Sequence, residues 1–324
     1  MKILVTGSSG FIGQWVCRTL KREQIEVVGL DSRPSASTQV DEHIACDIRD
    51  RARLIASVRR TAPDAVIHLA ARIDLLEKRD LAGYGANTDG VRNLIAAVRE
   101  TPSCRRVVHT SSQLVCRVGY VPTSPTDYCP NTVYGESKVL TEQIVREEGD
   151  SAGEWCLARP TTVWGPGMSP HYQTMLRLIA RGRYFHCGNS PLLKSYSYAE
   201  NIAWQYLQLV RAPRPSIQGK TFYLCDYEPL SLRRYANDVA ALIGAPKIPT
   251  LPLPVARGLA LTGDLINRVG VKKFPFNSFR LKNILTEYVF DTAETAAVCG
   301  SLPVTYAQGV AATARWFQDE VLRR

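Results

Sequence analysis

The sequence lacks the features that mark several classes of protein. No run of about 18 apolar residues occurs, and the nearest candidate, residues 251–270, is interrupted by proline, arginine and aspartate. The chain starts MKILVTGSSG, with one lysine and a short apolar run, which is not the pattern of a signal peptide. Low-complexity tracts and repeats are also missing. These absences predict a cytoplasmic globular protein with no membrane span, in which residues 251–270 form an amphipathic or half-buried helix.

Metal-binding patterns are missing as well. The nine cysteines include no Cys-x-x-Cys pair, and no cysteine/histidine cluster has zinc spacing. We therefore predict no metal site. Without a secretory signal, the thiols are expected to be reduced.

The charge is unbalanced toward the basic side, with 40 Lys and Arg against 30 Asp and Glu, a formal net charge of +10. Part of the excess is local, because no acid occurs between the basic residues of the segment 268–282. A basic excess can serve nucleic acid, acidic lipid or an anionic small substrate. No nucleic-acid motif accompanies it, so no nucleic-acid partner is predicted. A solvated basic face and a phosphate-bearing substrate remain as alternatives.

The first half of the chain alternates short apolar runs with helical patterns. Continuous apolar strands that alternate with helices are typical of a parallel sheet covered on both faces, the doubly wound α/β architecture. The predicted strands are 2–6, 26–31, 42–47, 64–71, 105–112 and 154–165, and the predicted helices are 11–23, 51–60, 87–100 and 133–148.

After about residue 165 the alternation weakens, and prolines and short elements dominate. Helical patterns remain near 171–182, 199–211, 231–243 and 305–322. We predict a nucleotide-binding domain over residues 1–165 and a smaller substrate-binding lobe over residues 166–324. The boundary is soft, because later segments can return to the sheet.

The stretch VTGSSGFIGQW places three glycines, Gly7, Gly10 and Gly13, between a strand and a helix. Glycines let the backbone turn tightly and approach a pyrophosphate, which then faces the N-terminus of the helix. The spacing G-x-x-G-x-x-G is one residue longer than the usual dinucleotide fingerprint. In this strand–helix context it predicts a dinucleotide site, which Phe11 and Ile12 of the same motif are expected to line.

Acidic residues follow the next two strands. Asp31 ends the second strand, where a carboxylate accepts hydrogen bonds from ribose hydroxyls and repels a 2′-phosphate, which favours NAD over NADP. Arg33 is either a partner for the 2′-phosphate of NADP or a surface charge in the loop. Asp47 and Ile48 are expected beside the adenine. The run HLAAR supplies three small or apolar residues where a strand passes the cofactor: Leu69, Ala70 and Ala71.

The stretch NTVYGESKV places Tyr134 four residues before Lys138. In a helix these positions share one face. By spacing alone, the phenol and the ammonium form either a surface pair or a device that lowers the pKa of the phenol.

The motifs together resemble the extended short-chain dehydrogenase/reductase family, and most closely its sugar-nucleotide epimerases and dehydratases. The resemblance covers nearly the whole chain and rests on TGSSGFIG, CDIRD, HLAA, NTDGVRNLI, VVHTSSQLV, YGESK, LARPTTVWGPG and YSYAENIA in this order. It implies a Rossmann fold and a bound NAD.

The resemblance also implies roles for single residues. Tyr134 would be the acid/base, Lys138 would hold the nicotinamide ribose, and Ser112 would bind the reacting oxygen. A phenol has a reference pKa near ~10, and a neighbouring ammonium favours the phenolate. The alternative for Ser112 is a capping hydroxyl at the end of a strand. Asn87 matches a family asparagine near the site or is a plain helix N-cap.

Further family positions concern the walls of the site and the substrate. Pro160 is expected to wall the nicotinamide, and Ser111 to line the approach. Two departures matter. Gln113 and Leu114 replace the acidic pair of the dehydratases, which argues against a 4,6-dehydratase. Thr162 replaces an asparagine of many epimerases in the region that contacts the diphosphate.

Two cations of the second half are predicted to meet a substrate diphosphate. Lys194, in LLKSYSYAENIA, aligns by type with a family segment whose basic residue contacts the diphosphate, and Arg280, in NSFRLKN, is the second candidate. The alternative for each is a surface position.

The residues and the resemblance together favour an NAD-dependent epimerase of a nucleotide-activated sugar, which oxidises C4 transiently to a ketone. The first alternative is a net oxidoreductase of the same fold, a keto-sugar reductase or a hydroxysteroid-type dehydrogenase. The second is a cofactor-bound regulator without catalysis, which would not need a tuned phenol. The resemblance further implies a homodimer, through helices near 81–101 and 131–147.

Overall fold

The computed structural model describes residues 1–34, 39–75, 80–268 and 276–322. The chain forms two compact units. Unit 1 contains three stretches of the chain: Met1–Val163, Ser197–Tyr227 and Phe290–Val304. Unit 2 contains the others: Trp164–Tyr196, Glu228–Val289 and Thr305–Arg324. Later segments therefore return to unit 1, while the assignment of cofactor and substrate to the two parts stays a prediction.

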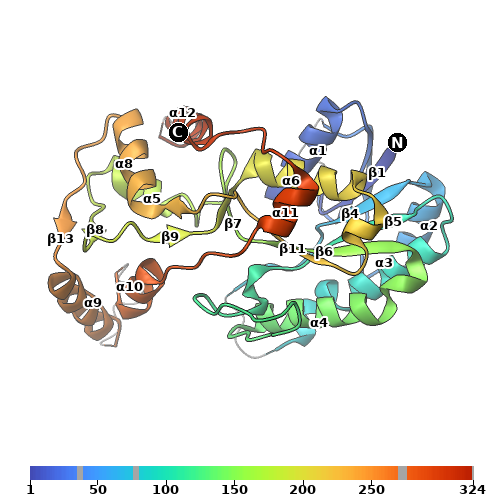
Figure 1. Cartoon of the computed structure of the whole chain (residues 1–324), viewed down its shortest axis with the longest axis horizontal. Helices are drawn as coiled ribbons and strands as arrows, with labels where there is room; N and C mark the ends of the chain where they lie inside the picture. Colours follow the sequence, from blue (N-terminus) through green and yellow to red (C-terminus); the bar gives the residue numbers. More distant parts are fainter. Residues whose placement is uncertain (35–38, 76–79, 269–275, 323–324) are drawn as a thin grey trace. The chain divides into compact units, whose positions relative to one another are not determined.

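Unit 1 is built on a seven-stranded parallel sheet, which confirms the predicted doubly wound architecture (Figure 1). The strand order is β11-β6-β5-β4-β1-β2-β3. The strands are β1 (Lys2–Thr6), β2 (Glu26–Asp31), β3 (Glu42–Ala45), β4 (Ala65–His68), β5 (Arg106–Thr110), β6 (Glu154–Pro160) and β11 (Thr221–Leu224). Their runs of valine, isoleucine and leucine are buried on both faces, as is typical of a parallel sheet.

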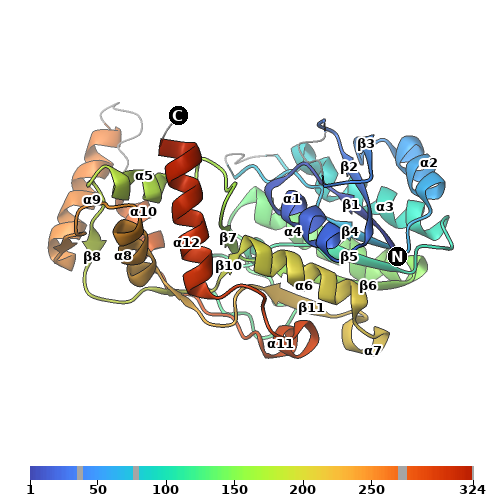
Figure 2. The same cartoon turned by 90° about the horizontal axis from the view of Figure 1, so that it is seen from above.

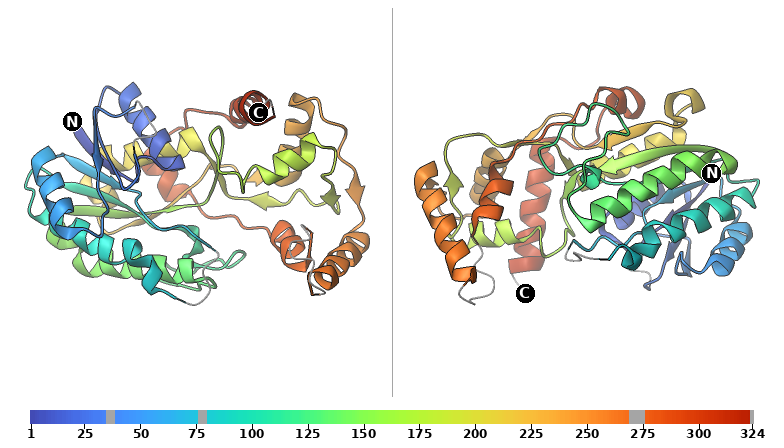
Figure 3. Two further views of the ribbon diagram at one scale, coloured as in Figure 1. Left: turned by 180° about the vertical axis from the view of Figure 1, so that it is seen from behind. Right: turned by 90° about the horizontal axis from the view of Figure 1, so that it is seen from below.

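Helices cover both faces of this sheet. One face packs against α1 (Phe11–Arg22) and α6 (Ala199–Arg211), which lie side by side in Figure 2, and α11 (Ala293–Cys299) joins them. The other face packs against α2 (Arg51–Thr61), α3 (Asp89–Arg99) and α4 (Val133–Glu148), of which α3 and α4 are seen in the right panel of Figure 3. The short helices of unit 1 are η1 (Ala82–Asn87), η2 (Gln113–Val115), η3 (Gly149–Ala152) and α7 (Arg214–Ile217).

Two sequence-based boundaries were wrong. The predicted strand 154–165 ends at Pro160, and a separate strand, β7 (Thr162–Trp164), follows. Val163 and Trp164 of β7 are also buried, so the apolar pattern of β6 continues into β7. Periodicity therefore could not reveal the break between the two strands. The predicted helix 305–322 is α12 (Tyr306–Trp316), followed by a π-helical turn, η4 (Phe317–Leu322). β11 was not predicted at all.

Unit 2 contains short elements around small cores. Its helices are α5 (Thr174–Ala180), α8 (Leu232–Leu242), α9 (Leu253–Arg268), α10 (Ser278–Leu285) and α12. One core joins α5 to α8, and a second joins α9 to α10. Two-stranded ladders connect β8 (His186–Cys187) to β13 (Thr250–Leu251) and β9 (Leu193–Lys194) to β12 (Leu230–Ser231). A further short strand, β10 (Tyr196–Tyr198), follows β9 along the chain.

Candidate active site

The loop between β1 and α1 is shaped by its glycines. Gly7 has a φ of +71°, and a Cβ there would lie 2.7 Å from the amide nitrogen of Ala70. A Cβ at Gly13 would collide with the carbonyl oxygen of Gly7. At Gly10 the nearest described atoms would be 3.1 and 3.9 Å away, so this side of the loop is more open. Gly7 and Gly13 thus permit the tight turn, and Gly10 leaves room for a ligand.

Helix α1 begins at Phe11, directly at this open side. Its N-cap is Gly10, which has no side chain to cap the helix. The first N–H groups of a helix lack intrahelical partners, and the macrodipole favours negative charge there. The loop and the helix N-terminus therefore fit the pyrophosphate of a dinucleotide, as the sequence predicts. Phe11 and Ile12 lie half-buried in this first turn.

By sequence, Asp31 favours NAD, whereas Arg33 could bind the 2′-phosphate of NADP. In the structure the two side chains are hydrogen-bonded to each other. The Asp31 side chain is 6% exposed and accepts a hydrogen bond from the amide of Ser9 at 3.0 Å. Its other oxygen accepts from the backbone N–H of Arg33 at 3.0 Å and from its Nε at 3.3 Å. The carboxylate is therefore fixed between the glycine loop and Arg33, whose side chain remains 65% exposed.

The remaining predicted cofactor contacts lie near the carboxyl ends of the strands. Asp47 accepts hydrogen bonds from Arg49, which lower the pKa of its carboxyl group. Ile48 is buried against Gly90 of α3, so it serves packing as well. The three residues after β4 are half-buried, and the amide of Ala70 donates to Thr6 Oγ1 at 3.2 Å. These are Leu69, Ala70 and Ala71.

Tyr134 and Lys138 lie one turn apart on α4, and both are buried, with 8% and 3% of their surface exposed. Their burial excludes the interpretation as a surface pair. The Lys138 Nζ donates to the carbonyl oxygen of Thr110 at 2.9 Å, at the carboxyl end of β5. Burial lowers the pKa of Lys138 to about 8, and the nearby Glu142 carboxylate opposes this shift.

The segment that carries Ser112 packs directly on the first turn of α4. A Cβ at Gly135 would collide with the carbonyl oxygen of Leu114, so glycine permits this approach. Ser112 Oγ accepts a hydrogen bond from the amide of Leu114 at 3.1 Å, as in the capping alternative. This bond uses only a lone pair, so the hydroxyl keeps its proton to donate. The two segments with Ser112 and Tyr134 are thus in contact.

A buried ion pair, which the sequence analysis missed, lies one turn further along α4. Glu142 and Arg159 are 0% and 1% exposed, and two hydrogen bonds of 2.7 and 2.8 Å join them. Glu142 also accepts from Ser111 Oγ at 2.6 Å and from Tyr128 Oη at 3.0 Å. Ser111, predicted to line the approach, therefore points into this cluster. The spacing Tyr134, Lys138, Glu142 could have revealed it, because steps of four keep one helix face.

Asn87 ties α4 to the loop after β4. Its side chain is 1% exposed and binds both the N–H and the C=O of Arg72, at 2.8 and 3.0 Å, and Ser137 Oγ at 2.9 Å. Ser137 Oγ in turn donates to the carbonyl oxygen of Tyr134. The Asn87 side chain does not cap α3, so the N-cap alternative is wrong. Its place near the cofactor stays a prediction.

Aromatic rings and histidines surround the base of the site. The rings of Tyr84 and Tyr134 are 6.4 Å apart, and Tyr206 Oη is 2.9 Å from Thr110 Oγ1. His68 and His109, opposite each other on β4 and β5, form a fully buried edge-to-face pair at 5.8 Å. Burial lowers both histidine pKa values, that of His109 to about 3. The pair is therefore neutral and adds no charge near Lys138.

The predicted substrate residues have different environments. Lys194 in unit 2 is 2% exposed, and its Nζ donates to the carbonyl oxygens of Asn283 at 3.1 Å and Thr286 at 2.6 Å. Burial lowers its pKa to about 8. Arg280 is exposed in the first turn of α10. A diphosphate would therefore have to use the remaining N–H of Lys194 or replace these bonds.

Two further predicted residues lie at the end of β6. Pro160 is buried, and as the last residue of the strand it pairs with Leu224 of β11. Thr162 is half-buried and begins β7. Their contacts to cofactor and substrate stay predictions.

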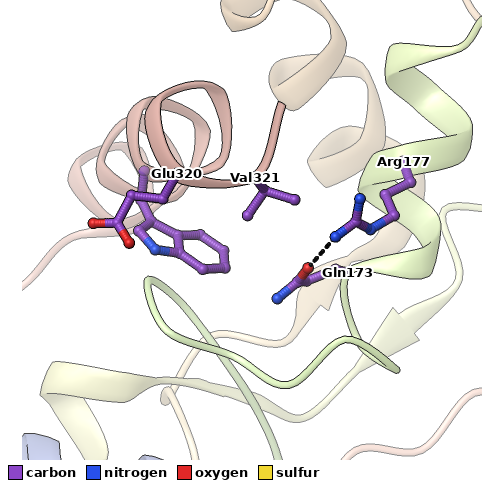
Figure 4. Close-up of a pocket in the computed structure, with 5 residues that line it drawn as sticks. Gln173, Arg177, Glu320 and Val321 are labelled. Carbon is purple, nitrogen blue, oxygen red and sulfur yellow. Dashed lines mark hydrogen bonds between the residues drawn. The ribbon is translucent and has the colours of Figure 1, made fainter. Parts of the chain in front are cut away.

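A cavity of about 380 Å³ lies in unit 2 (Figure 4). Its lining includes the hydrogen-bonded pair Gln173 and Arg177, at 2.9 Å, and residues of the C-terminal helical turn. None of the predicted site residues lines it, so this cavity does not bear on the predicted chemistry.

Comparison with known proteins identifies the family of this chain. The sequence profile of the NAD dependent epimerase/dehydratase family matches residues 3–225. The chain therefore belongs to this family.

Relatives in the family have both isomerase and oxidoreductase names. A 2-alkyl-3-oxoalkanoate reductase from Stenotrophomonas maltophilia is 29% identical over 76% of this chain and 77% of its own. An N-acetyl-alpha-D-glucosaminyl-diphospho-ditrans,octacis-undecaprenol 4-epimerase from Escherichia coli O157:H7 is 25% identical over 97% and 94%. A 3-beta-hydroxysteroid dehydrogenase from Mycolicibacterium neoaurum is 26% identical over 77% and 72%.

Among solved structures, the UDP-glucose 4-epimerase of Thermus thermophilus in complex with NAD has a TM-score of 0.72. It is 20% identical and covers 99% of this chain and 100% of its own. This similarity establishes the shared fold.

Proposed function

We propose that this member of the family is an epimerase of a nucleotide-activated sugar, which oxidises the C4 hydroxyl transiently and reduces the ketone on its other face. The observation that carries the proposal is the buried face of α4. It presents Tyr134 and Lys138 one turn apart, against the segment that holds Ser112. This arrangement suits proton transfer at a secondary alcohol.

Each of the three residues has one task. Ser112 donates a hydrogen bond to the reacting oxygen and orients it. The Lys138 ammonium stabilises the phenolate of Tyr134 and holds the nicotinamide ribose. Tyr134 accepts the proton of the C4 hydroxyl as hydride leaves C4, and it returns this proton after hydride has come back to the other face. A bound nicotinamide dinucleotide supplies the hydride acceptor and donor. The substrate and the protein therefore end with unchanged oxidation states.

The relatives that match nearly the whole chain include an epimerase and a dehydrogenase. The epimerase from E. coli matches 97% of this chain, including unit 2, and a 3beta-hydroxysteroid-dehydrogenase/decarboxylase from Arabidopsis thaliana matches 94%. The name of that epimerase gives a diphospho-polyprenol as the group that carries the sugar. A polyprenyl-diphosphate sugar therefore belongs beside the nucleotide sugars among the substrates to be tested.

A net NAD(P)-dependent oxidoreductase is the second candidate. The bonds of Lys194 to two backbone carbonyls favour it, because they leave this cation less available to a diphosphate. The catalytic residues would have the same tasks, but hydride would not return to the substrate.

One experiment separates the two. The purified protein is incubated with a panel of nucleotide sugars and a polyprenyl-diphosphate sugar, without added cofactor, and the products are read by NMR. An epimerase yields an isomer without accumulating NADH. In a parallel sample with added NAD, NADH that grows mole for mole with a keto product would assign the oxidoreductase. A Tyr134→Phe sample shows that turnover comes from this site.

We further propose that NAD is preferred to NADP. The Asp31 carboxylate is held at the end of β2 by Ser9 and Arg33, where it would repel a 2′-phosphate. Titration of both dinucleotides by fluorescence tests this preference. The variant Asp31→Asn should show a smaller difference in affinity between NAD and NADP. Tighter binding of NADP by the wild-type protein would contradict it.

The homodimer through α3 and α4 also remains a proposal. Both helices lie on the same face of the sheet and are joined by an ion pair of Arg92 and Glu148 at 3.0 Å. Sedimentation at micromolar concentration should give twice the mass of the chain. A monomer would reject the proposal.

A further inference from the structure

Helix α9 buries small residues and exposes large apolar residues, which is the reverse of the usual distribution. Its buried residues are small: Ala256, Ala260 and Gly263. Its large aliphatic residues are exposed, namely Val255 at 50%, Leu259 at 45%, Leu261 at 65% and Leu265 at 61%. A surface helix of a globular protein normally turns such residues toward the core. Here the burial of leucine and valine requires something outside the described structure.

The exposed residues form one continuous surface. One row of the helix contains Val255, Leu259 and Ile266 at helical spacing. The adjacent row contains Gly258, Leu261 and Leu265. Helix α10 packs against the other side of α9, through Leu281 and the buried alanines. Its Phe279 is 70% exposed. We call the four exposed aliphatic residues of α9 the α9 apolar face.

The charge of this segment is almost entirely positive. Between residues 253 and 286 the sequence contains six cations and a single acid, Asp264. The amide of Ser278 donates to Asp264 at 3.3 Å, so this carboxylate is directed toward the start of α10. Arg257 and Arg268 are both exposed and lie eleven residues apart, which places them along one edge of α9 beside Leu261.

We propose that the α9 apolar face docks on an anionic lipid surface. Helices that lie in a membrane interface combine a leucine- or phenylalanine-rich face with flanking lysine and arginine. The apolar side chains would enter the acyl boundary, and the cations would meet the phosphate headgroups. The helix would lie in the plane of the surface, since no helix of the described residues is long and apolar enough to cross a bilayer.

A second copy of the chain fits this face less well. A two-fold contact between two α9 helices would bring the basic edges of both copies together, with only Asp264 of each copy to offset them. Like charges at an interface oppose association. An anionic surface, by contrast, neutralises the cations while it buries the leucines. The inference does not depend on which reaction the protein catalyses.

The test uses the full-length protein and sedimentation with vesicles. One set contains equal parts of phosphatidylglycerol and phosphatidylcholine, and the other phosphatidylcholine alone. The wild-type protein should sediment with the first set. The variant Leu261→Ser/Leu265→Ser and the variant Arg257→Gln/Arg268→Gln should each bind roughly tenfold or more weakly, because each removes one part of the interaction.

Leu242→Ser is the matched control, because Leu242 of α8 is also an exposed leucine of unit 2, at 50%, but lies outside the face. It should bind like the wild type. Failure of the wild-type protein to sediment with the mixed vesicles would overturn the proposal, as would equal binding to pure phosphatidylcholine. A smaller mass of Leu261→Ser/Leu265→Ser than of the wild type in light scattering would instead assign the face to a contact between copies. Isomerase turnover on a soluble sugar nucleotide, measured in the same variants, is a separate readout of the proposed function.

Discussion

Helices α4 and α9 have the same length, 16 residues, and each departs from the usual distribution of side chains in its own way. Helix α4 buries charged residues, Lys138 and Glu142. Helix α9 exposes leucines and buries alanines. In α4 each buried charge has partners within the chain, so the helix face is fixed. In α9 the apolar side chains are not covered by the described residues, and contact with another molecule would bury them with a gain in free energy.

The comparison shows that catalysis and docking require different distributions of side chains. Chemistry requires polar groups in fixed positions away from water, which costs desolvation and must be offset by hydrogen bonds. Docking requires apolar surface that stays exposed in the free protein. The distribution expected for catalysis is the buried polar network around residues 110–114 and α4. The distribution expected for docking is the exposed apolar side of α9.

The largest effect is expected from the α4 face. Tyr134→Phe keeps the ring but removes the group that transfers the proton. Turnover should fall by ~10²–10⁴-fold, the usual contribution of a general acid–base residue. Binding of NAD, measured by fluorescence, should persist. Activity within twofold of the wild type would show that the buried face of α4 is structural, and the comparison with α9 would lose its basis.

Removal of Arg159 should test the buried network through stability. Arg159→Met removes the cation that is hydrogen-bonded to the buried Glu142 carboxylate and leaves only Arg146, at 3.7 Å, among the described ion-pair partners, which should lower the free energy of unfolding by about 3–5 kcal/mol. The double variant Glu142→Gln/Arg159→Met should recover part of this loss, since the amide is neutral. Urea denaturation measures both. On α9 the matched change Arg268→Gln alters an exposed cation and should stay within about 0.5 kcal/mol. Equal costs on the two helices would contradict the distinction.

Glycines of the two helices give a second matched pair. Gly135→Ala in α4 forces a Cβ against the carbonyl oxygen of Leu114, which should destabilise the protein by about 1–3 kcal/mol and displace the Ser112 segment. Gly258→Ala in α9 meets no described heavy atom within 4 Å, so it should stabilise the helix by about 0.5–1 kcal/mol. Melting temperatures that move in the same direction for both variants would refute this prediction.

The pH dependence should reveal the Lys138 ammonium. Burial lowers the pKa of Lys138 to about 8, so the charged form exists below this pH and is lost as the pH rises through it. The value of kcat/KM, which reports groups of the free enzyme, should therefore fall above pH 8. Glu142→Gln removes a charge that raises this pKa, so the alkaline limb should move to lower pH. A limb that stays in place would show that another group controls it.

Much of the fold could be read from the sequence. Continuous apolar runs gave six strands of the sheet, and helical spacing gave α1, α2, α4 and α6 with nearly correct bounds. β11 was missed because TFYL is short and far along the chain from β6, with which it pairs. The exposed leucines of α9 were hidden because a helical apolar pattern does not say which side faces the core.

The candidate site was foreseen in part. The order of glycine loop, serine and Tyr-x-x-x-Lys belongs to the linear sequence, and so do the residue types at each position. The partners of these residues do not: Glu142 and Arg159 are 17 residues apart, and Lys194 and Thr286 are 92 apart. Long-range partners arise only when packed elements bring distant side chains together.

The sequence alone thus determined the parallel α/β architecture and the positions that a dinucleotide and a proton-transfer pair would use, because periodicity and short spacings are local properties. Only the tertiary structure decided which charges are buried, which cation already has its hydrogen bonds, and which leucines remain outside. Burial is a property of the whole packed chain, and it sets the pKa of Lys138 as much as it sets the exposure of Leu261.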